Sequence, residues 1–202
     1  MSDPGKESTA PALEPVSHPL FTIGYGNRSL EQLIAVLQAN RITQLIDVRT
    51  APYSRFKPEF SRDALQAALQ RHGIDYLFMG DTLGGQPDCP DCYTEGKADY
   101  AKIRSQTFYQ SGIEHLRNLL RASRRFALMC SEGRPEQCHR SKLIGESLHA
   151  LGIPICHLDE DNQPRSQTQI IDRLTGGQLN LFDTPSFTSR KRYVSKPGKG
   201  QP

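Results

Sequence analysis

The sequence has no apolar run close to the roughly 18 residues of a membrane-spanning helix, which excludes such a helix. Its N-terminus also lacks a basic start followed by an apolar segment, which excludes a secretory signal there. Cysteine is scarce and odd in number, with five residues, so we expect reduced thiols rather than a disulfide framework. These absences predict a soluble, cytoplasmic protein that has no membrane partner.

The body of the chain has no excess of positive or negative charge. The net charge is +3, but residues 190–202 contain five basic residues and no acid, whereas residues 1–20 contain three acids and one lysine. The remaining residues, 21–189, are therefore neutral. A neutral body does not predict a domain that wraps a duplex, although the basic tail leaves contact with nucleic acid open.

A length of 202 residues suits one domain with tails. Residues 1–19 contain four of the 14 prolines and predict a disordered leader. We expect residues 20–183 to form the single domain and residues 184–202 to form a basic, flexible tail.

Short β-rich runs alternate with amphipathic segments along the predicted domain. Strands are expected at residues 20–24, 43–49, 74–79, 126–130 and 153–158. Helices are expected after Ser29, which has Gln32 in capping-box position, after Ser61, around residues 113–120 and around residues 143–151. This alternation predicts an α/β fold, a single three-layer domain whose mainly parallel sheet of five or more strands has helices on both faces.

Polar and reactive residues follow the ends of the predicted strands. Because the carboxyl ends of parallel strands meet at one edge of the sheet, where ligands bind, these residues predict a pocket. The alternative is that loops of α/β proteins are generally polar. The residues concerned are Tyr25, Asp47, Arg49, Tyr53, Arg55, Cys130, Glu132 and His157.

Cys130 leaves a buried strand and precedes a helix N-terminus, a position that lowers a thiol pKa and favours an anion. Tyrosine phosphatases and rhodanese-type proteins use a similar strand, cysteine, loop and helix. A phosphatase loop needs arginine six residues after the cysteine, where this chain has Glu136, so that assignment fails. The alternative for Cys130 is a small buried side chain in the core.

The triplet Cys138, His139 and Arg140 opens the next predicted helix. Successive helical residues point about 100° apart, so the three side chains cannot all face one point. His139 is the candidate for proton transfer, since an imidazole titrates near neutral pH, and Cys138 joins it as a catalytic candidate. Local packing or capping is the alternative.

Three arginines, Arg49, Arg55 and Arg140, predict a site for a phosphate or carboxylate. Asp47 projects on the same side of its strand as Arg49. An Asp–Arg pair that merely fixes the loop is therefore the alternative.

Cys89 and Cys92 have the spacing of a zinc knuckle, but the chain has no second C-x-x-C and no H-x-x-x-H to complete a site. We therefore predict no metal and no cofactor. Cys156 is expected in the core.

Several of these segments together resemble the family named domain of unknown function 488. The matching segments, in the family's order, are residues 22–29, 47–55 with Phe60, 83–85, 99–100 and 130–140. The activity of that family is not established. The resemblance implies that certain residues of this chain occupy positions of the family's pattern. They are Asp47, Arg49, Arg55, Cys130, Cys138, His139 and Arg140. Members usually lack the Cys89 and Cys92 pair, which further weakens a zinc assignment.

Two functions follow from these residues. The first is an enzyme, a hydrolase or a transferase, acting on a nucleotide, a nucleic-acid end or a phosphorylated metabolite. Arginines would hold the anion, Cys130 would be the nucleophile, and Glu132 or His139 would move the proton. The alternative is a non-catalytic module that binds nucleic acid or a nucleotide through the same arginines and the basic tail. The neutral body favours the enzyme, and no feature indicates an oligomeric state.

Overall fold

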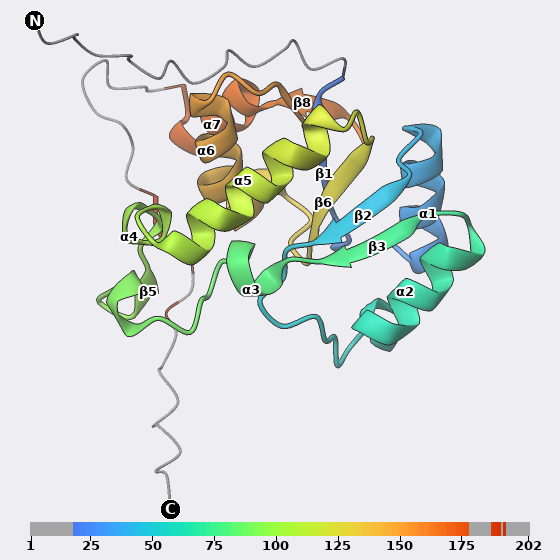
Figure 1. The fold of residues 1–202 in the computed structure, drawn as a ribbon, viewed down its shortest axis with the longest axis horizontal. Coiled ribbons are helices and arrows are strands. Elements are labelled where there is room, and N and C mark those ends of the chain that lie inside the picture. Colours follow the sequence, from blue (N-terminus) through green and yellow to red (C-terminus); the bar gives the residue numbers. More distant parts are fainter. Residues whose placement is uncertain (1–17, 178–186, 191, 193–202) are drawn as a thin grey trace, which may run out of the picture.

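The computed structural model describes residues 18–177, 187–190 and 192 (Figure 1). Its middle layer is a six-stranded sheet in the order β3-β2-β6-β1-β7-β8. The strands are β1 (Leu20–Gly24), β2 (Gln44–Asp47), β3 (Asp75–Phe78), β6 (Phe126–Cys130), β7 (Ile155–Leu158) and β8 (Pro164–Ser166). The first five in sheet order run parallel, and β8 pairs antiparallel with β7. The predicted α/β class and mainly parallel sheet are confirmed.

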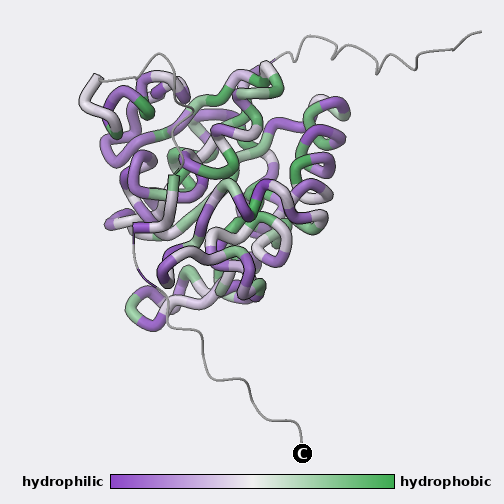
Figure 2. The backbone as a smooth tube through the Cα atoms, turned by 90° about the vertical axis from the view of Figure 1, so that its left-hand side faces the viewer, coloured by the Kyte–Doolittle hydropathy of each residue, from purple (hydrophilic) through white to green (hydrophobic). Residues whose placement is uncertain are grey.

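Helices cover both faces of this sheet. One face is covered by α1 (Leu30–Ala39) and α2 (Arg62–Arg71), whose Leu33 and Leu65 belong to one apolar cluster. The other face is covered by α5 (Thr107–Arg121), α6 (Glu146–Ala150) and α7 (Gln167–Thr175). These helices bury Leu116, Leu148 and Ile171 in a second cluster. Along the helical turns the colour in Figure 2 alternates between hydrophilic and hydrophobic, as expected for amphipathic helices packed on a sheet.

The local sequence explains where the helices begin and end. Ser29 caps α1 with the predicted capping box, in which its hydroxyl accepts from the Gln32 amide and the Gln32 side chain accepts from Ser29. The α2 helix begins after Ser61 as expected, although the Ser61 side chain makes no capping bond. Gly73, which follows α2, has a φ of +70°, a left-handed conformation that glycine adopts at little cost.

Several elements were not predicted. They are β8, α7, α3 (Gly80–Leu83), α4 (Tyr100–Arg104) and the hairpin of β4 (Tyr93–Thr94) and β5 (Lys97–Ala98). The helix predicted around residues 143–151 begins as a π-helical turn, Arg140–Gly145, which continues into α6. Leu151, the last residue of that predicted range, is 41% exposed because it stands at the C-cap.

The thiols differ from the expectation in one respect. Cys89 and Cys92 form a disulfide, so the prediction of reduced thiols is wrong for this pair. The C-x-x-C spacing, a sequence separation of three, brings the two sulfurs together locally, and the other three cysteines form no disulfide. Cys130, Cys138 and Cys156 are free.

Part of the predicted tail lies on the domain. Phe187 is buried, Thr188 forms a β-bridge with Asp99, and the Ser189 amide donates to the carbonyl of Ala98. Residues 1–17 of the predicted leader, and most of the predicted tail, lie outside the described residues. The proposed domain boundaries therefore stay predictions. No helix in the described residues has both the length and the apolar character needed to cross a bilayer.

Candidate active site

A pocket of about 250 Å³ opens at the carboxyl ends of the central strands β1, β2 and β6. The chain leaves β1 and β2 towards α1 and α2 on one face, and leaves β6 towards α6 on the opposite face. In open α/β sheets, ligands bind where neighbouring strands diverge in this way. The residues lining the pocket are Tyr25, Arg49, Thr50, Ala51, Tyr53, Gly85, Gln86, Tyr100, Cys130, Ser131, Glu132, Gln137, Cys138, His139, Ser189 and Arg190.

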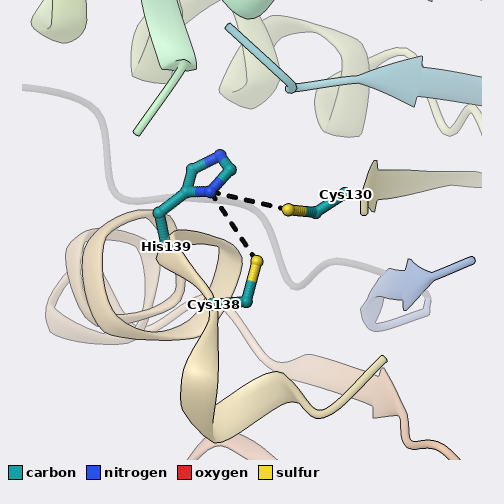
Figure 3. A group of neighbouring side chains, drawn as sticks. All are labelled: Cys130, Cys138 and His139. Atoms are coloured by element: carbon teal, nitrogen blue, oxygen red, sulfur yellow. Dashed lines mark hydrogen bonds between the residues drawn. The ribbon is translucent and has the colours of Figure 1, made fainter. Parts of the chain in front are cut away.

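Three side chains form a compact cluster in this pocket. Cys130 ends β6, while Cys138 and His139 directly precede the π-helical turn. The Nδ1 atom of His139 lies 3.6 Å from the sulfur of Cys130 and 3.7 Å from the sulfur of Cys138 (Figure 3). The two cysteines are 4% and 1% exposed. The π-helical turn supplies the local backbone shape, and such turns are frequent at functional sites.

A backbone contact fixes the orientation of the His139 ring. Its Nε2 lies 3.0 Å from the carbonyl oxygen of Val48, which follows β2. Because a carbonyl oxygen only accepts, Nε2 carries the hydrogen, and Nδ1 of the neutral ring presents its lone pair to the two sulfurs. Val48 is itself fixed because its amide donates to Met129 of β6. The imidazole is therefore placed as a base for a thiol.

The two thiols differ in acidity. A hydrogen bond from Cys138 holds the pKa of Cys130 well below its usual value in spite of burial, and His139 and Arg140 act in the same direction. Burial and the neighbouring Cys130 raise the pKa of Cys138 well above its usual value. Cys130 is therefore the more acidic thiol of the pair.

Arg49 brings a cation to the other side of the pocket. Its Nε and Nη2 atoms donate to the two carboxylate oxygens of Asp47 at 2.9 and 2.6 Å, and the Tyr76 hydroxyl donates to the same carboxylate at 2.8 Å. Burial alone would lower the pKa of Arg49, but the bonds to Asp47 raise it above its ordinary value. The Nη1 atom, buried like the rest of the side chain, makes no hydrogen bond within the described part of the chain. That unused donor belongs to a residue that lines the pocket.

Arg190 is a lining residue that the sequence did not reveal, since we assigned it to the tail. Its guanidinium donates to Gln137 at 2.8 Å and pairs with Glu132 at 3.4 Å, and it is half exposed. The strand-like contact between Thr188 and Asp99 brings it there. No local pattern in the sequence indicates that contact.

Three predicted binding residues lie elsewhere. Arg140 is fully buried and donates to the backbone carbonyls of Glu132 and Gly133, so it holds the loop after β6. Arg55 lies outside the pocket lining, with its guanidinium carbon 4.6 Å from the ring centre of Phe56. Neither guanidinium lines the pocket, because the loop carbonyls bind that of Arg140 and Arg55 lies on an exposed loop outside the pocket.

His157 is the third of these residues. It lies within the sheet, where Nδ1 contacts the Thr22 hydroxyl at 2.7 Å and Nε2 contacts the Gln167 side-chain oxygen at 2.6 Å. Burial lowers its pKa to about 3. The ring is therefore neutral and structural, and it has no access to the pocket.

The structure brings most of the predicted residues together. The predicted residues that line the pocket are Tyr25, Arg49, Tyr53, Cys130, Glu132, Cys138 and His139. Asp47 lies behind Arg49 and orients it rather than lining the pocket itself. The ligating atoms of the cluster of two cysteines and one histidine lie within 4.8 Å of one another, so this set could hold a metal ion, which the sequence analysis did not predict.

The fold and the site together define a small α/β protein with a cysteine–histidine cluster facing an arginine at the switch point of its sheet. The chain belongs to the family described as Domain of unknown function DUF488, whose model matches residues 29–146. The matched residues include the cluster and Arg49, whereas Tyr25 and Arg190 lie outside them. Neither the curated proteins nor the solved structures gave a significant match.

Proposed function

We propose that the protein is an enzyme that acts on a small anionic substrate, with Cys130 as its nucleophile. The observation that carries this proposal is the meeting of two devices in one pocket. Cys130 lies 3.6 Å from a histidine nitrogen that is oriented to accept its proton, and Arg49 contributes a buried donor with no partner among the described residues. A thiol beside an oriented base is the arrangement of an activated nucleophile.

The two devices come from opposite faces of the sheet. Asp47 stands two residues after Leu45 and therefore projects from the same face of β2, the α1 and α2 side, where it holds Arg49. Cys130 stands two residues after Leu128 and therefore projects from the same face of β6, the α5 and α6 side. Because Arg49 and Cys130 line the same pocket, an anion bound to Nη1 of Arg49 would share that pocket with the Cys130 sulfur. Arg190 would add a second, solvent-screened cation at the same pocket.

The chemistry would be substitution at the atom that bears the anionic group. The Cys130 sulfur would form a bond to that atom, and the leaving group would depart with the bonding electron pair. His139, having taken the thiol proton on Nδ1, would return it to the leaving group. A nucleotide, a nucleic-acid end or a phosphorylated metabolite offers such an atom, and transfer to water or to another acceptor would make the protein a hydrolase or a transferase. Because the cluster needs free thiols, we propose that the protein works in the cytoplasm, where the Cys89–Cys92 disulfide would be reduced.

One observation favours a second candidate function, a non-catalytic module that binds nucleic acid or a nucleotide. Tyr53 and Phe56 are 71% and 85% exposed, and Arg55 lies against Phe56. Exposed aromatic rings next to cationic side chains are typical of surfaces on which bases stack. In this case the pocket would bind a phosphate and Cys130 would have no reactive role.

The two candidates differ in the reactivity of Cys130, which can be tested without knowing the substrate. Iodoacetate and iodoacetamide alkylate thiols in the same way, but only iodoacetate is an anion. In the reduced, metal-free protein we expect Cys130 to prefer iodoacetate by about tenfold more than Cys156 does, roughly the effect of one hydrogen bond to a charged group. Inorganic phosphate should protect Cys130 from both reagents. Peptide mass mapping identifies the modified thiol.

Variants locate the source of the preference. The double variant Asp47→Asn/Arg49→Gln removes the cation together with its partner and should abolish the preference for iodoacetate. Arg55→Gln, which removes a cation outside the pocket, should leave it unchanged. An inert Cys130 in the metal-free wild type, or the same preference with and without Arg49, would overturn the proposed enzyme. An inert Cys130 in a protein that still binds phosphate would support the binding module.

A further inference from the structure

The cluster of Cys130, Cys138 and His139 has the donor set of a thiophilic metal site. Zn²⁺ binds cysteine sulfur at about 2.3 Å and histidine nitrogen at about 2.0–2.1 Å, with tetrahedral angles. Two such donors on one ion are then separated by about 3.6 Å. In this structure Nδ1 of His139 is 3.6 Å from one sulfur and 3.7 Å from the other. The two nitrogen-to-sulfur separations therefore match those of a tetrahedral site, and all three donor atoms lie within 4.8 Å of one another.

The surroundings of His139 match what a metal-binding histidine requires. Such a histidine usually donates its second ring N–H to a backbone carbonyl or a carboxylate, which fixes the ring and leaves the other nitrogen free for the metal. Nε2 of His139 makes this bond to the carbonyl of Val48, 3.0 Å away. Figure 3 shows this free nitrogen, Nδ1, in contact with both sulfurs.

Burial gives the cation a second role. Both cysteines are almost fully buried, so two thiolates at this distance would repel each other strongly without a counter-charge. A divalent cation neutralises the pair. The positive charge of Arg49 is already compensated by Asp47, so it does not oppose a cation at the cluster.

We propose that Cys130, Cys138 and His139 bind one thiophilic divalent ion of the zinc class, with its fourth coordination position open to the pocket. Three protein ligands with one free position are typical of reactive rather than purely structural zinc sites. A water molecule or the oxygen of an anion would take the fourth position, within the pocket that Arg49 lines. The site stands on its own geometry and does not depend on the proposed thiol chemistry. Because a coordinated thiolate shares one lone pair with the metal, it is less nucleophilic than a free thiolate, and we expect slower alkylation of Cys130 in the loaded protein.

Co²⁺ is the probe, because it adopts zinc geometry and absorbs visible light. The experiment uses the full-length chain with Cys89→Ser/Cys92→Ser, so that the reduced C-x-x-C pair cannot bind metal, after treatment with a chelator. We expect one Co²⁺ per chain, thiolate-to-cobalt charge-transfer absorption and the intense visible bands of a tetrahedral site. Zn²⁺ should displace the Co²⁺ and remove both absorptions.

Ligand variants and a matched thiol control test the assignment. Cys138→Ser and His139→Asn should each weaken Co²⁺ binding by about 100-fold or more, at least the loss known for the outer partners of ligands. Cys156→Ser, which removes the remaining free thiol in the described residues, should leave the spectrum unchanged. Circular dichroism of the metal-free variants checks that they fold.

The outcomes are distinct from those of the alkylation experiment. The absence of thiolate-to-cobalt absorption in the otherwise intact chain overturns the metal site, whatever the ligand variants do. A spectrum that survives Cys138→Ser, or one lost in Cys156→Ser, also overturns it. A normal Co²⁺ spectrum together with an inert metal-free Cys130 supports the metal site and rejects the nucleophile. Slower alkylation of Cys130 on adding one equivalent of Zn²⁺ would show that the ion binds at the same thiol.

Discussion

His139 donates its Nε2–H to the carbonyl oxygen of Val48 at 3.0 Å, and this bond decides which ring nitrogen faces the thiols. Without that partner the ring could turn about its side-chain bond and could carry its hydrogen on either nitrogen, since the two neutral tautomers are close in energy. Val48 follows β2 and His139 precedes the π-helical turn, so the bond joins segments that are 91 residues apart. Both the thiol chemistry and the metal site that we propose need this orientation.

The first prediction concerns Gly85, which lies against the His139 ring. A Cβ at this position would come within 2.7 Å of Cγ and 2.8 Å of Cβ of His139, so Gly85→Ala should push the ring away from the sulfurs. We expect slower alkylation of Cys130, weaker Co²⁺ binding and a loss of about 1–3 kcal/mol in unfolding free energy. Gly133→Ala is the matched control, since its Cβ would meet nothing closer than 3.6 Å. Equal behaviour of the two variants would contradict the prediction.

The second prediction concerns the buried pair of Asp47 and Arg49. Asp47→Asn leaves the charge of Arg49 buried without its partner, which should cost about 3–5 kcal/mol in a denaturant titration. Asp75→Asn breaks the pair of Asp75 and Arg124, whose side chains are 70% and 53% exposed, and should cost less than about 1 kcal/mol. Similar losses in the two variants would show that Arg49 reaches solvent or another anion.

The third prediction concerns pH. The pKa of His157 falls to about 3 on burial, so the folded ring stays neutral while the unfolded ring takes a proton below its ordinary pKa of 6.5. Stability contributed by the neutral ring is therefore complete above about pH 6.5 and lost as the pH falls towards 3, by up to about 1.4 kcal/mol per pH unit.

The variant His157→Gln isolates that contribution, because all other titrating groups are shared. The unfolding free energies of the wild type and the variant should differ by a constant amount above pH 7. Between pH 6 and pH 4 the unfolding free energy of the wild type should fall steadily relative to that of the variant, with roughly the slope expected for the uptake of one proton on unfolding. A difference that does not change with pH would mean that His157 is accessible to protons in the folded protein.

The fourth prediction separates the two arginines whose placement the sequence did not reveal. Arg190→Gln removes a half-exposed cation that lines the pocket, so it should weaken phosphate protection of Cys130 by about two- to fivefold at low salt and less at high salt. Arg55→Gln removes a cation outside the lining and should have no effect. An equal effect of the two substitutions would assign the protection to net charge rather than to the pocket.

Local sequence was sufficient for the framework of the fold. The strands β1 and β6 lie at their predicted residues because continuous apolar runs favour strands buried on both faces. The α1 helix begins at the capping box of Ser29, which is a contact between residues three apart. The short elements α3, α4 and β8 were missed because stretches of three to five residues carry no readable period.

Only part of the candidate site could be predicted from the sequence. Cys130 and Arg49 were identifiable because each ends a buried run, and strand ends meet at one edge of a parallel sheet. His157 also stands near the end of a buried strand, yet it is enclosed by Thr22 and Gln167. Arg140, which begins the π-helical turn, binds loop carbonyls. A position at the end of a strand does not say which way the side chain points.

The sequence by itself therefore determined the α/β class, the edge of the sheet and the residue types gathered there, because these follow from hydrophobic period, caps and strand ends, which act over a few residues. The tertiary structure alone decided which ring nitrogen of His139 meets the sulfurs, that Arg49 keeps one donor unused and that Arg190 comes to the pocket. Each of these depends on contacts between segments 50 or more residues apart or on the direction of a single side chain, and packing in three dimensions sets both.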